Sequence, residues 1–285
     1  MRITLTNDRQ KKIRLSNLAK GYRIREIRGL SPADADIATT EYALSNGSMV
    51  TNRRIPKRNI VIDFYLSTSQ AEEVKLDLYE KLHTAEWLRF DYETKNISAY
   101  ADGILESFDA RTWQGLPAFQ LSLICPDPYF YDTEETTGTY SRTTDGFQFP
   151  LPDGLAVPES GIPFSTVTAG RTIVLQNHGA ETGLTVQAEF SGKASFFQIK
   201  KVETDESLTI GFNFKAGDVL TIVSTDSEKT VTVRRTSETI NAINGFVIGS
   251  EWLTMSRGRN SFEIHSDGLS SVRADISFRE RYSGV

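Results

Sequence analysis

The segment Leu123–Asp132 constrains this chain most, because an alternating apolar run stops there in two prolines and three aromatic residues. Pro126 and Pro128 cannot donate to a strand ladder, so they end the strand or confine it to a sheet edge. The residue before each proline is pushed towards extended geometry, which predicts a stiff, non-helical arm. Aromatic side chains on such an arm must pack on their own domain or on a partner. The segment therefore marks a structural seam between two halves of the chain.

Length and composition are those of a globular protein with two ordinary domains: 285 residues, 39% of them hydrophobic and 24% charged. The longest apolar runs are far too short for a membrane span, and Met1–Gln10 lacks the apolar region of a secretory signal. A single cysteine excludes an internal disulfide framework and a multi-cysteine zinc site. We therefore expect folding in a reducing cytoplasm.

Charge is unevenly distributed although the net charge is only -5. Residues 1–58 sum to about +8, residues 59–132 to about -8 and the remainder to about -5. Such asymmetry fits a nucleic-acid arm or mutual docking between copies. An acidic total without interleaved basic and aromatic residues makes specific nucleic-acid binding the weaker interpretation.

The first half reads as strands around one helix. Residues 60–66 and 87–92 alternate as strands, and residues 119–123 alternate again before the seam. Between the first two, Ser69 and Glu72 form a capping-box pattern that predicts a helix over about 69–83. The apolar stripe of that helix is Ala71, Val74, Leu78 and Leu82. A sheet packed under a single helix is expected.

Residues 29–57 are poor in apolar side chains and contain Pro32, Gly47 and Pro56. A loop of this length inside a compact domain is usually functional or disordered. Apolar pairs on either side of the turn-like residues 45–48 indicate that part of it forms an extended hairpin.

The second half is strand-like, and short apolar runs recur at regular intervals between turn signals, which favours a β-sandwich. The turn signals are Asn177-His178-Gly179, Ala216-Gly217-Asp218 and Arg257-Gly258-Arg259-Asn260. Residues 133–160 are rich in Thr, Gly, Pro and Asp and read as a linker.

Four features together resemble the distal tail protein (Dit) family of long-tailed bacteriophages, in the order of that family and across nearly the whole chain. They are Tyr100-Ala101-Asp102-Gly103, the block Cys125-Pro126-Asp127-Pro128-Tyr129-Phe130-Tyr131-Asp132, the three turn signals of the second half, and the terminus Ile276–Val285. The proline-aromatic block is fairly specific, and the glycine turns are individually weak.

The resemblance implies a mainly β fold with two domains. Residues 1–132 would form a tail-tube-like, ring-forming domain with one helix, completed by a C-terminal strand at 272–285. Residues 161–271 would form a galectin-like β-sandwich. Asn177 precedes His178 where the family commonly has proline, so this turn departs from the pattern.

The function implied by the resemblance is structural. Members form a hexameric ring at the tail tip that joins the tail tube to the baseplate hub. Partners would be further copies of the chain, the tail tube protein, the tail-associated hub or lysin protein, the tape-measure protein and, in many members, receptor-binding proteins. The protein would be made in the host bacterial cytoplasm and reside in the virion, without enzymatic activity, cofactor, metal or membrane contact.

Two groups of residues are candidate assembly elements. The seam motif comprises Cys125, Pro126, Asp127, Pro128, Tyr129, Phe130 and Tyr131, whose aromatics are either a domain-domain staple or an intersubunit contact. A basic loop comprises Arg53, Arg54, Lys57 and Arg58, which we expect to dock on the acidic middle of the next copy.

Catalytic readings have little support. His83, His178 and His265 lack metal-site spacing, and Cys125 reads as a buried structural thiol. No paired carboxylates, phosphate-binding glycine loop or nucleophile elbow can be assigned from the sequence. The rival interpretation is a carbohydrate-binding adhesion module built on the second-half sandwich. Trp113, in an expected hairpin turn, is the tryptophan most suited to an exposed contact.

Overall fold

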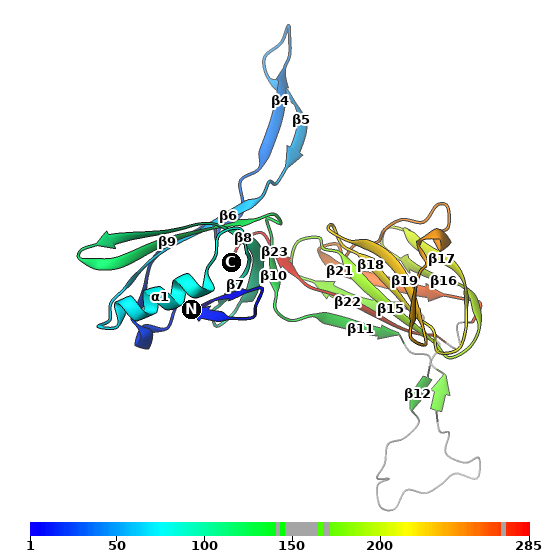
Figure 1. The fold of residues 1–285 in the computed structure, drawn as a ribbon. Helices are drawn as coiled ribbons and strands as arrows, with labels where there is room; N and C mark the ends of the chain where they lie inside the picture. Colours follow the sequence, from blue (N-terminus) through cyan, green and yellow to red (C-terminus); the bar gives the residue numbers. More distant parts are fainter. Residues whose placement is uncertain (141–142, 146–164, 168–171, 269–271) are drawn as a thin grey trace, which may run out of the picture. The chain divides into compact units, whose positions relative to one another are not determined.

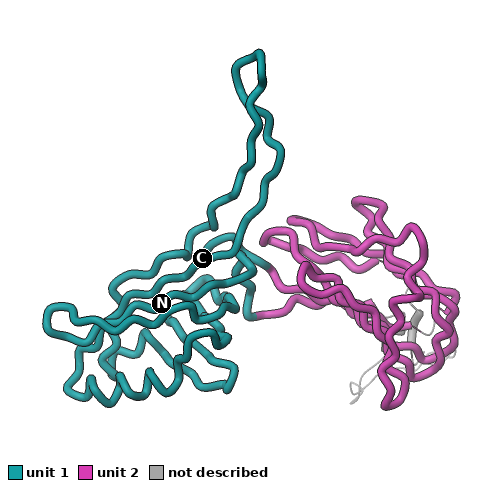
Figure 2. The backbone as a smooth tube through the Cα atoms, turned by 45° about the horizontal axis from the view of Figure 1, so that its top comes forward, with its two compact units in different colours: residues 1–133, 281–285 teal, residues 134–280 magenta. Residues whose placement is uncertain are grey.

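The computed structural model describes residues 1–140, 143–145, 165–167, 172–268 and 272–285 (Figure 1). The chain divides into two compact units, Met1–Thr133 with Arg281–Val285, and Glu134–Glu280 (Figure 2). Strands dominate both units, which confirms the mainly β fold class. Within the described residues α1 (Ala71–Lys81) is the one α-helix, and no helix there is long and apolar enough to cross a membrane.

The first unit is built on an antiparallel sheet in the order β2-β1-β7-β8-β9-β6-β3, with β10 pairing β8 and β23 beside it. Its strands are β1 (Arg2–Asn7), β2 (Lys12–Arg14), β3 (Tyr22–Arg28), β4 (Asp36–Glu41), β5 (Ser48–Arg54), β6 (Arg58–Leu66), β7 (Trp87–Glu93), β8 (Ser98–Trp113), β9 (Leu116–Cys125), β10 (Phe130–Asp132) and β23 (Arg281–Tyr282). A short 3-10 helix, η1 (Leu18–Lys20), precedes β3. Strands β4 and β5 pair only with each other and form a separate hairpin, the arm.

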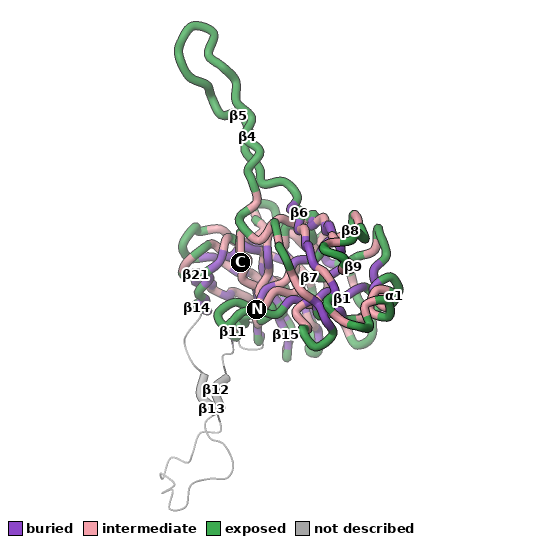
Figure 3. Tube along the Cα trace, turned by 90° about the vertical axis from the view of Figure 1, so that its left-hand side faces the viewer, coloured by how far each residue is buried: buried purple, intermediate pink, exposed green. Residues whose placement is uncertain are grey.

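One face of this sheet holds the core of the unit, because alternate residues of its strands are apolar. Figure 3 marks the buried residues in purple. Leu78 and Leu82 are buried in the same core, which confirms the predicted stripe of α1. The predicted capping box is wrong: the N-cap is Gln70, and no side chain caps the helix. The hydroxyl of Thr68 instead accepts a hydrogen bond from the Gln70 N–H (3.3 Å), so the helix starts after this turn.

Strands β8 and β9 form the longest hairpin of the unit. Strand β8 runs without interruption over Ser98–Trp113, with a bulge in its pairing to β9 between Leu105 and Ser107. Gln114 and Gly115 both have positive φ, 50° and 79°, as a two-residue hairpin turn requires. Trp113 is half-buried at this turn, with its ring centroid 4.8 Å from that of Tyr65.

The second unit contains two main antiparallel sheets, in the orders β11-β22-β15-β18-β19-β20 and β14-β21-β16-β17, which share one core. Its strands are β11 (Thr136–Tyr140), β12 (Thr143–Asp145), β13 (Ser165–Val167), β14 (Thr172–Asn177), β15 (Leu184–Phe190), β16 (Ala194–Lys201), β17 (Ser207–Phe214), β18 (Val219–Ser224), β19 (Lys229–Arg235), β20 (Glu238–Asn241), β21 (Gly258–His265) and β22 (Val272–Phe278). A 3-10 turn, η2 (Ile243–Gly245), follows β20. The predicted sandwich is thus present.

Residues 133–160 are not simply a linker. Thr136–Tyr140 is an edge strand of the larger sheet and pairs with β22. Gly138, which reads as linker composition, is required for packing: a Cβ there would lie 2.7 Å from a side-chain atom of Ile173. Residues 143–145 pair with β13, and the rest of the predicted linker, 141–142 and 146–160, lies outside the described residues.

The predicted C-terminal strand 272–285 does not complete the first domain as a whole. Val272–Phe278 is a central strand of the sandwich, and its four alternate apolar side chains are buried in the sandwich core. Burial of the larger of these side chains favours a place in the sandwich over an exposed one, because each contributes about 1–3 kcal/mol of transfer free energy. Only Arg281–Val285 returns to the first unit.

Candidate assembly surfaces

The seam motif folds back into the first unit. Strand β9 ends at Cys125, where burial raises the pKa of the thiol to about 12, and a turn follows. The Asp127 carboxylate holds this turn, because it accepts hydrogen bonds from the Tyr129 N–H (3.0 Å) and the Tyr131 hydroxyl (2.6 Å). Phe130 is fully buried in the core of the unit. The thiol is therefore a packing group at neutral pH, as expected from the sequence.

The aromatic side chains of the motif contact residues of their own unit. The Phe130 ring lies 6.4 Å from that of Phe90, and the Tyr131 ring 6.0 Å from that of Tyr100. Tyr129 packs under the guanidinium of Arg281, 4.3 Å from its ring centroid. An intersubunit role for Phe130 is thus wrong, because the core of the first unit already buries it.

Arg58 is the residue that sequence reasoning misassigned. It was expected in an exposed docking loop, but it is 2% exposed and its guanidinium donates to backbone carbonyls of three separate segments. Those carbonyls belong to Gly29 (2.5 Å), Ser31 (2.6 Å), Pro128 (2.7 Å) and Ser283. Burial lowers the pKa of Arg58, although an arginine keeps its charge in any case. Arg58 is therefore unavailable to a partner.

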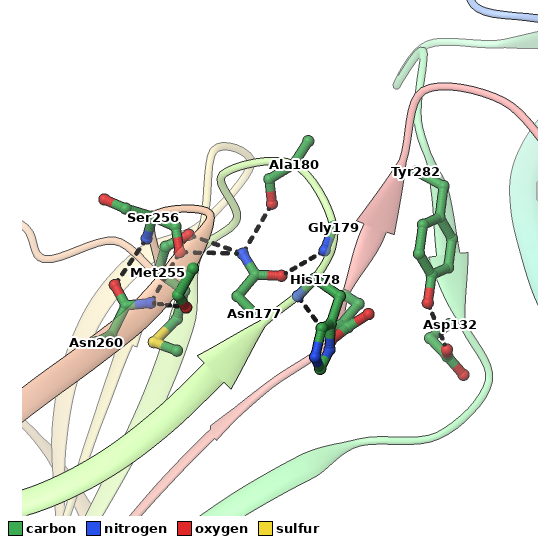
Figure 4. A network of polar contacts seen from close by, with 11 residues as sticks. Asp132, Asn177, His178, Gly179, Ala180, Met255, Ser256, Asn260 and Tyr282 are labelled. Carbon is green, nitrogen blue, oxygen red and sulfur yellow. Dashed lines mark hydrogen bonds and ion pairs between the residues drawn. The ribbon is translucent and has the colours of Figure 1, made fainter.

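The C-terminal residues form further hydrogen bonds in the region that Arg58 holds together. Tyr282 pairs with Phe130, and its hydroxyl donates to the Asp132 carboxylate at 2.8 Å (Figure 4). The Val285 N–H donates to the Leu30 carbonyl at 3.0 Å. The base of the arm, the seam and the C-terminus are thus held together by Arg58 and these neighbouring bonds.

The arm itself is unsupported by its own chain. Every residue of β4 and β5 is exposed, although the two strands are well paired with each other. An isolated two-stranded hairpin is only marginally stable in water. The exposed large apolar side chains of the arm are Ile37, Tyr42, Leu44, Met49 and Val50. Leu44, at the tip, is completely exposed.

The other three members of the predicted basic loop are exposed, but they are not equivalent. Arg54 is engaged, because its Nε lies 3.0 Å from a carboxylate oxygen of Asp36 across the hairpin. Arg53, on β5, and Lys57, just before β6, form no ion pair within the described part of the chain. These two are the cations that remain available on the arm and at its base.

The sheet face opposite the core of the first unit carries several paired charges. Arg89 and Asp102 face each other across β7 and β8 with two hydrogen bonds of 2.8 and 2.9 Å, and this carboxylate raises the pKa of Arg89. Asp63 lies 2.5 Å from Arg111 and 3.5 Å from Arg28. Charges on this face are thus largely neutralised by neighbours.

The asparagines of two turn signals in the second half are buried and hold their turns by hydrogen bonds to the backbone. The Asn177 amide donates to the carbonyls of Ala180 (2.9 Å) and Met255 (3.1 Å), and its oxygen accepts from the Gly179 N–H (3.0 Å) (Figure 4). Asn260 bridges the next turn in the same way, accepting from the Ser256 N–H at 2.9 Å. Both asparagines are fully buried, and their side chains are satisfied by local backbone groups.

No histidine lies in a catalytic or metal arrangement in the parts of the chain described. His178 pairs with Glu280 (2.9 Å), His265 lies 3.4 Å from Glu263, and His83 contacts a helix carbonyl. Among the described residues no three His, Cys, Asp or Glu side chains gather as metal ligands would.

Comparison with known proteins agrees with this architecture. Residues 179–282 match the family of siphovirus-type tail components, C-terminal domain. The crystal structure of SPP1 Dit (gp 19.1), described as a paradigm of the hub adsorption apparatus in phages infecting Gram-positive hosts, has a TM-score of 0.67 at 16% identity and covers 98% of this chain and 99% of that chain. No curated protein matches the chain.

Two further matches come from phage P2. Chains of its activated baseplate, with Ca and with Sr, have TM-scores of 0.55 and 0.51 at 9% and 10% identity. They cover 100% and 97% of this chain and 99% and 97% of theirs. These matches confirm the resemblance to phage distal tail proteins: the chain has the Dit fold over nearly its whole length, and residues 179–282 match the C-terminal domain of the siphovirus-type tail component family.

Proposed function

We propose that this protein is a structural component of the distal tail of a long-tailed phage or a phage-derived tail-like particle. Copies would close into a hexameric ring that joins the tail tube to the tail-tip apparatus. The observation that carries this proposal is the fold match to SPP1 Dit over nearly the full length of both chains. The protein would reside in the virion and act through geometry, without catalysis.

The arm supports closure by contacts between unlike surfaces, as a ring requires. It carries five exposed large apolar side chains on a ribbon that its own chain does not cover. Docking it on the next copy would bury this surface and stabilise both strands. The arm is thus the element of this chain best suited to reach a neighbour.

The charges of the arm support the same contact, but through two cations instead of the four that the sequence suggests. Arg53 and Lys57 are the exposed cations that would face the acidic region of the next copy, because Arg58 is buried and Arg54 is paired. The double variant Arg53→Glu, Lys57→Glu is expected to weaken association most at low salt, where such contacts are least screened. An unchanged assembly at low salt would exclude this electrostatic contact.

The charge-paired face of the first sheet is suited to line a channel. Several of its charges are paired, as Arg89 is with Asp102, so it presents few isolated charges to a passing chain. Tape-measure protein and DNA would pass without being held. The tail tube protein, the hub or lysin protein and receptor-binding proteins would be the remaining neighbours in the tail.

The deciding experiment compares the purified full chain with a variant in which a short Gly-Ser turn replaces residues 36–54. Native mass spectrometry and negative-stain imaging should find closed six-membered rings for the intact chain and smaller species for the variant. Circular dichroism serves as the folding control. Strictly monomeric intact protein at the highest attainable concentration, together with its absence from the tips of purified particles, would refute the proposal.

A further inference from the structure

A pocket of about 250 Å³ opens at the edge of the sheet in the first unit. Strands β2 and β3 lie at opposite ends of the strand order, yet residues of both line this pocket, together with residues of η1 and α1. The pocket therefore lies where the two edge strands approach each other without pairing, beside the helix. It shares no residue with the arm or the seam motif, so its chemistry is independent of those surfaces.

Tyr22 brings an unmet hydrogen-bonding group to this pocket. The residue is 2% exposed, and its ring centroid lies 6.1 Å from that of Phe64 in the core. Its hydroxyl has no hydrogen-bond partner in the described part of the chain. The hydroxyl is not sealed off, because it keeps accessible surface where Tyr22 lines the pocket. Burial and, secondly, the Asp77 carboxylate raise its pKa to about 12, so the group stays protonated and can donate to a ligand.

The open edge of β2 supplies two backbone donors. The Leu15 N–H, just after this strand, donates to the Ile3 carbonyl of β1 at 3.1 Å. In an antiparallel pair, alternate residues bond the partner strand and the residues between them turn their N–H groups the other way. Those residues are Lys12 and Arg14, and both line the pocket. Their amides have no backbone partner among the residues that the structure describes.

Positive charge exceeds negative charge in the lining, which contains four cations and one carboxylate: Lys12, Arg14, Lys20, Lys81 and Asp77. The carboxylate is already neutralised, because Lys81 Nζ lies 2.6 Å from it. Lys12 is shared with Asp91 outside the pocket, where burial raises the carboxyl pKa and Lys12 opposes that rise. Arg14 and Lys20 form no ion pair within the described ranges. The excess charge is therefore available to an anion.

The segment that carries Lys20 and Tyr22 is held by local caps. The Asn17 carboxamide oxygen accepts a hydrogen bond from the Lys20 N–H at 3.4 Å. Gly21 ends η1 with a φ of 84°, and its N–H donates to the Leu18 carbonyl at 3.1 Å. A backbone fixed in this way loses little further freedom when a ligand binds, so the donors are arranged in advance.

The donors select a compact anion with more than one charge. A carboxylate or a phosphodiester carries a single charge, whereas a phosphomonoester carries about 1.5 to 2 negative charges at pH 7 and has three acceptor oxygens. The cavity is smaller than the roughly 300–1,000 Å³ of sites for drug-sized ligands, so only a short group can accompany the phosphate. We propose that this pocket binds a phosphomonoester, with the Tyr22 hydroxyl, the β2 amides, Arg14 and Lys20 as donors.

The test is isothermal titration calorimetry of the full chain with glycerol 3-phosphate, up to about 10 mM in phosphate-free buffer. Tyr22→Phe should weaken binding about tenfold, as expected for one hydrogen bond to a charged group. Its unfolding midpoint should not fall, because the hydroxyl has no partner in the folded chain. Arg14→Gln combined with Lys20→Gln should abolish measurable binding. Lys95→Gln is the matched control, since Lys95 is an exposed lysine of the same unit outside the pocket.

Competing ligands define the chemical class and the source. Dimethyl phosphate, a diester, and glutarate, which presents carboxylates as an acidic peptide would, should each bind at least tenfold more weakly than glycerol 3-phosphate. Displacement of glycerol 3-phosphate by a 5′-phosphorylated oligothymidylate, but not by its unphosphorylated form, would assign the site to phosphate at chain ends. Displacement by neither would assign it to a free phosphomonoester.

Three results would overturn the proposal. The first is that glycerol 3-phosphate does not bind. The second is that glutarate, dimethyl phosphate or the unphosphorylated oligonucleotide binds as tightly, which would indicate an unselective basic surface. The third is that Lys95→Gln weakens binding as much as Tyr22→Phe. Ring assembly of Tyr22→Phe, measured in parallel, should be normal, so failure here is distinguishable from failure of the proposed structural function.

Discussion

The guanidinium of Arg58 lies 4.5 Å from the centroid of the Phe130 ring, inside the first unit. This pair joins the strand after the arm to the seam motif, and the same guanidinium donates a hydrogen bond to the Ser283 carbonyl in the C-terminal segment. A buried cation that meets only carbonyls and a ring face is stabilised by dipoles and by the ring quadrupole. Arg58 thereby fixes the point from which the arm leaves the unit.

Replacing Arg58 with methionine should therefore loosen the arm base. The change keeps an apolar stem but leaves four carbonyls without their donor, which should cost about 3 kcal/mol or more of folding free energy. Hydrogen exchange should accelerate at the Val285 amide, which bonds the Leu30 carbonyl nearby. Arg53→Met, an exposed control on the arm, should change stability by less than about 0.5 kcal/mol. Equal exchange in the two variants would show that Arg58 does not hold this junction.

The exposed apolar tip of the arm should matter for association and not for folding. Leu44→Ser combined with Met49→Ser should leave the unfolding midpoint nearly unchanged, because neither side chain is buried in the monomer. Sedimentation velocity should show a shift towards smaller species. Ile248→Ser is the matched control, since Ile248 is equally exposed but lies in the second unit. If the control reduced association as strongly, the arm would not be the specific contact.

Local patterns predicted much of the fold. Alternation in β6 and the stripe of α1 are visible in the sequence because each depends on neighbours in the chain. The assignment of Val272–Phe278 failed for the opposite reason. The alternation of apolar residues along a strand does not show which domain core the strand joins. Here that is set by pairing with β15 on one side and β11 on the other.

The role of Arg58 also lay beyond the sequence pattern. It follows a long polar stretch with other basic residues, which made an exposed docking role natural. Its partners are backbone carbonyls, at sequence separations from 27 to 225 residues, and carbonyls leave no signature in residue types. By contrast, the turn asparagines and Asp218 could be picked out, because their side chains fold onto local backbone.

The Cys125 thiol should be inert while the protein is folded. Burial raises its pKa to about 12, so almost none of the thiolate exists at pH 8. A thiol reagent at that pH should modify Cys125 very slowly in the native chain. In the urea-unfolded chain it should react at the rate of an exposed cysteine. Mass spectrometry of the labelled protein measures both rates. Rapid native labelling would mean that β9 opens readily or that the thiol is accessible.

Asp218 should make the stability of the second unit depend on acid pH. It accepts hydrogen bonds from Arg235 (2.8 and 2.6 Å) and from the Lys215 N–H (2.8 Å), and the Arg235 hydrogen bonds lower its pKa most. Because the folded pKa lies below the unfolded value of about 3.9, this stabilisation is complete above that value and disappears as pH falls through the folded pKa. Asp218→Asn should therefore cost about 2 kcal/mol near neutral pH, and the difference from wild type should shrink below about pH 4. Urea unfolding followed by Trp252 fluorescence, with Trp87 and Trp113 replaced by phenylalanine in both proteins, measures this unit. A difference that stays constant with pH would show that the charge of Asp218 does not contribute.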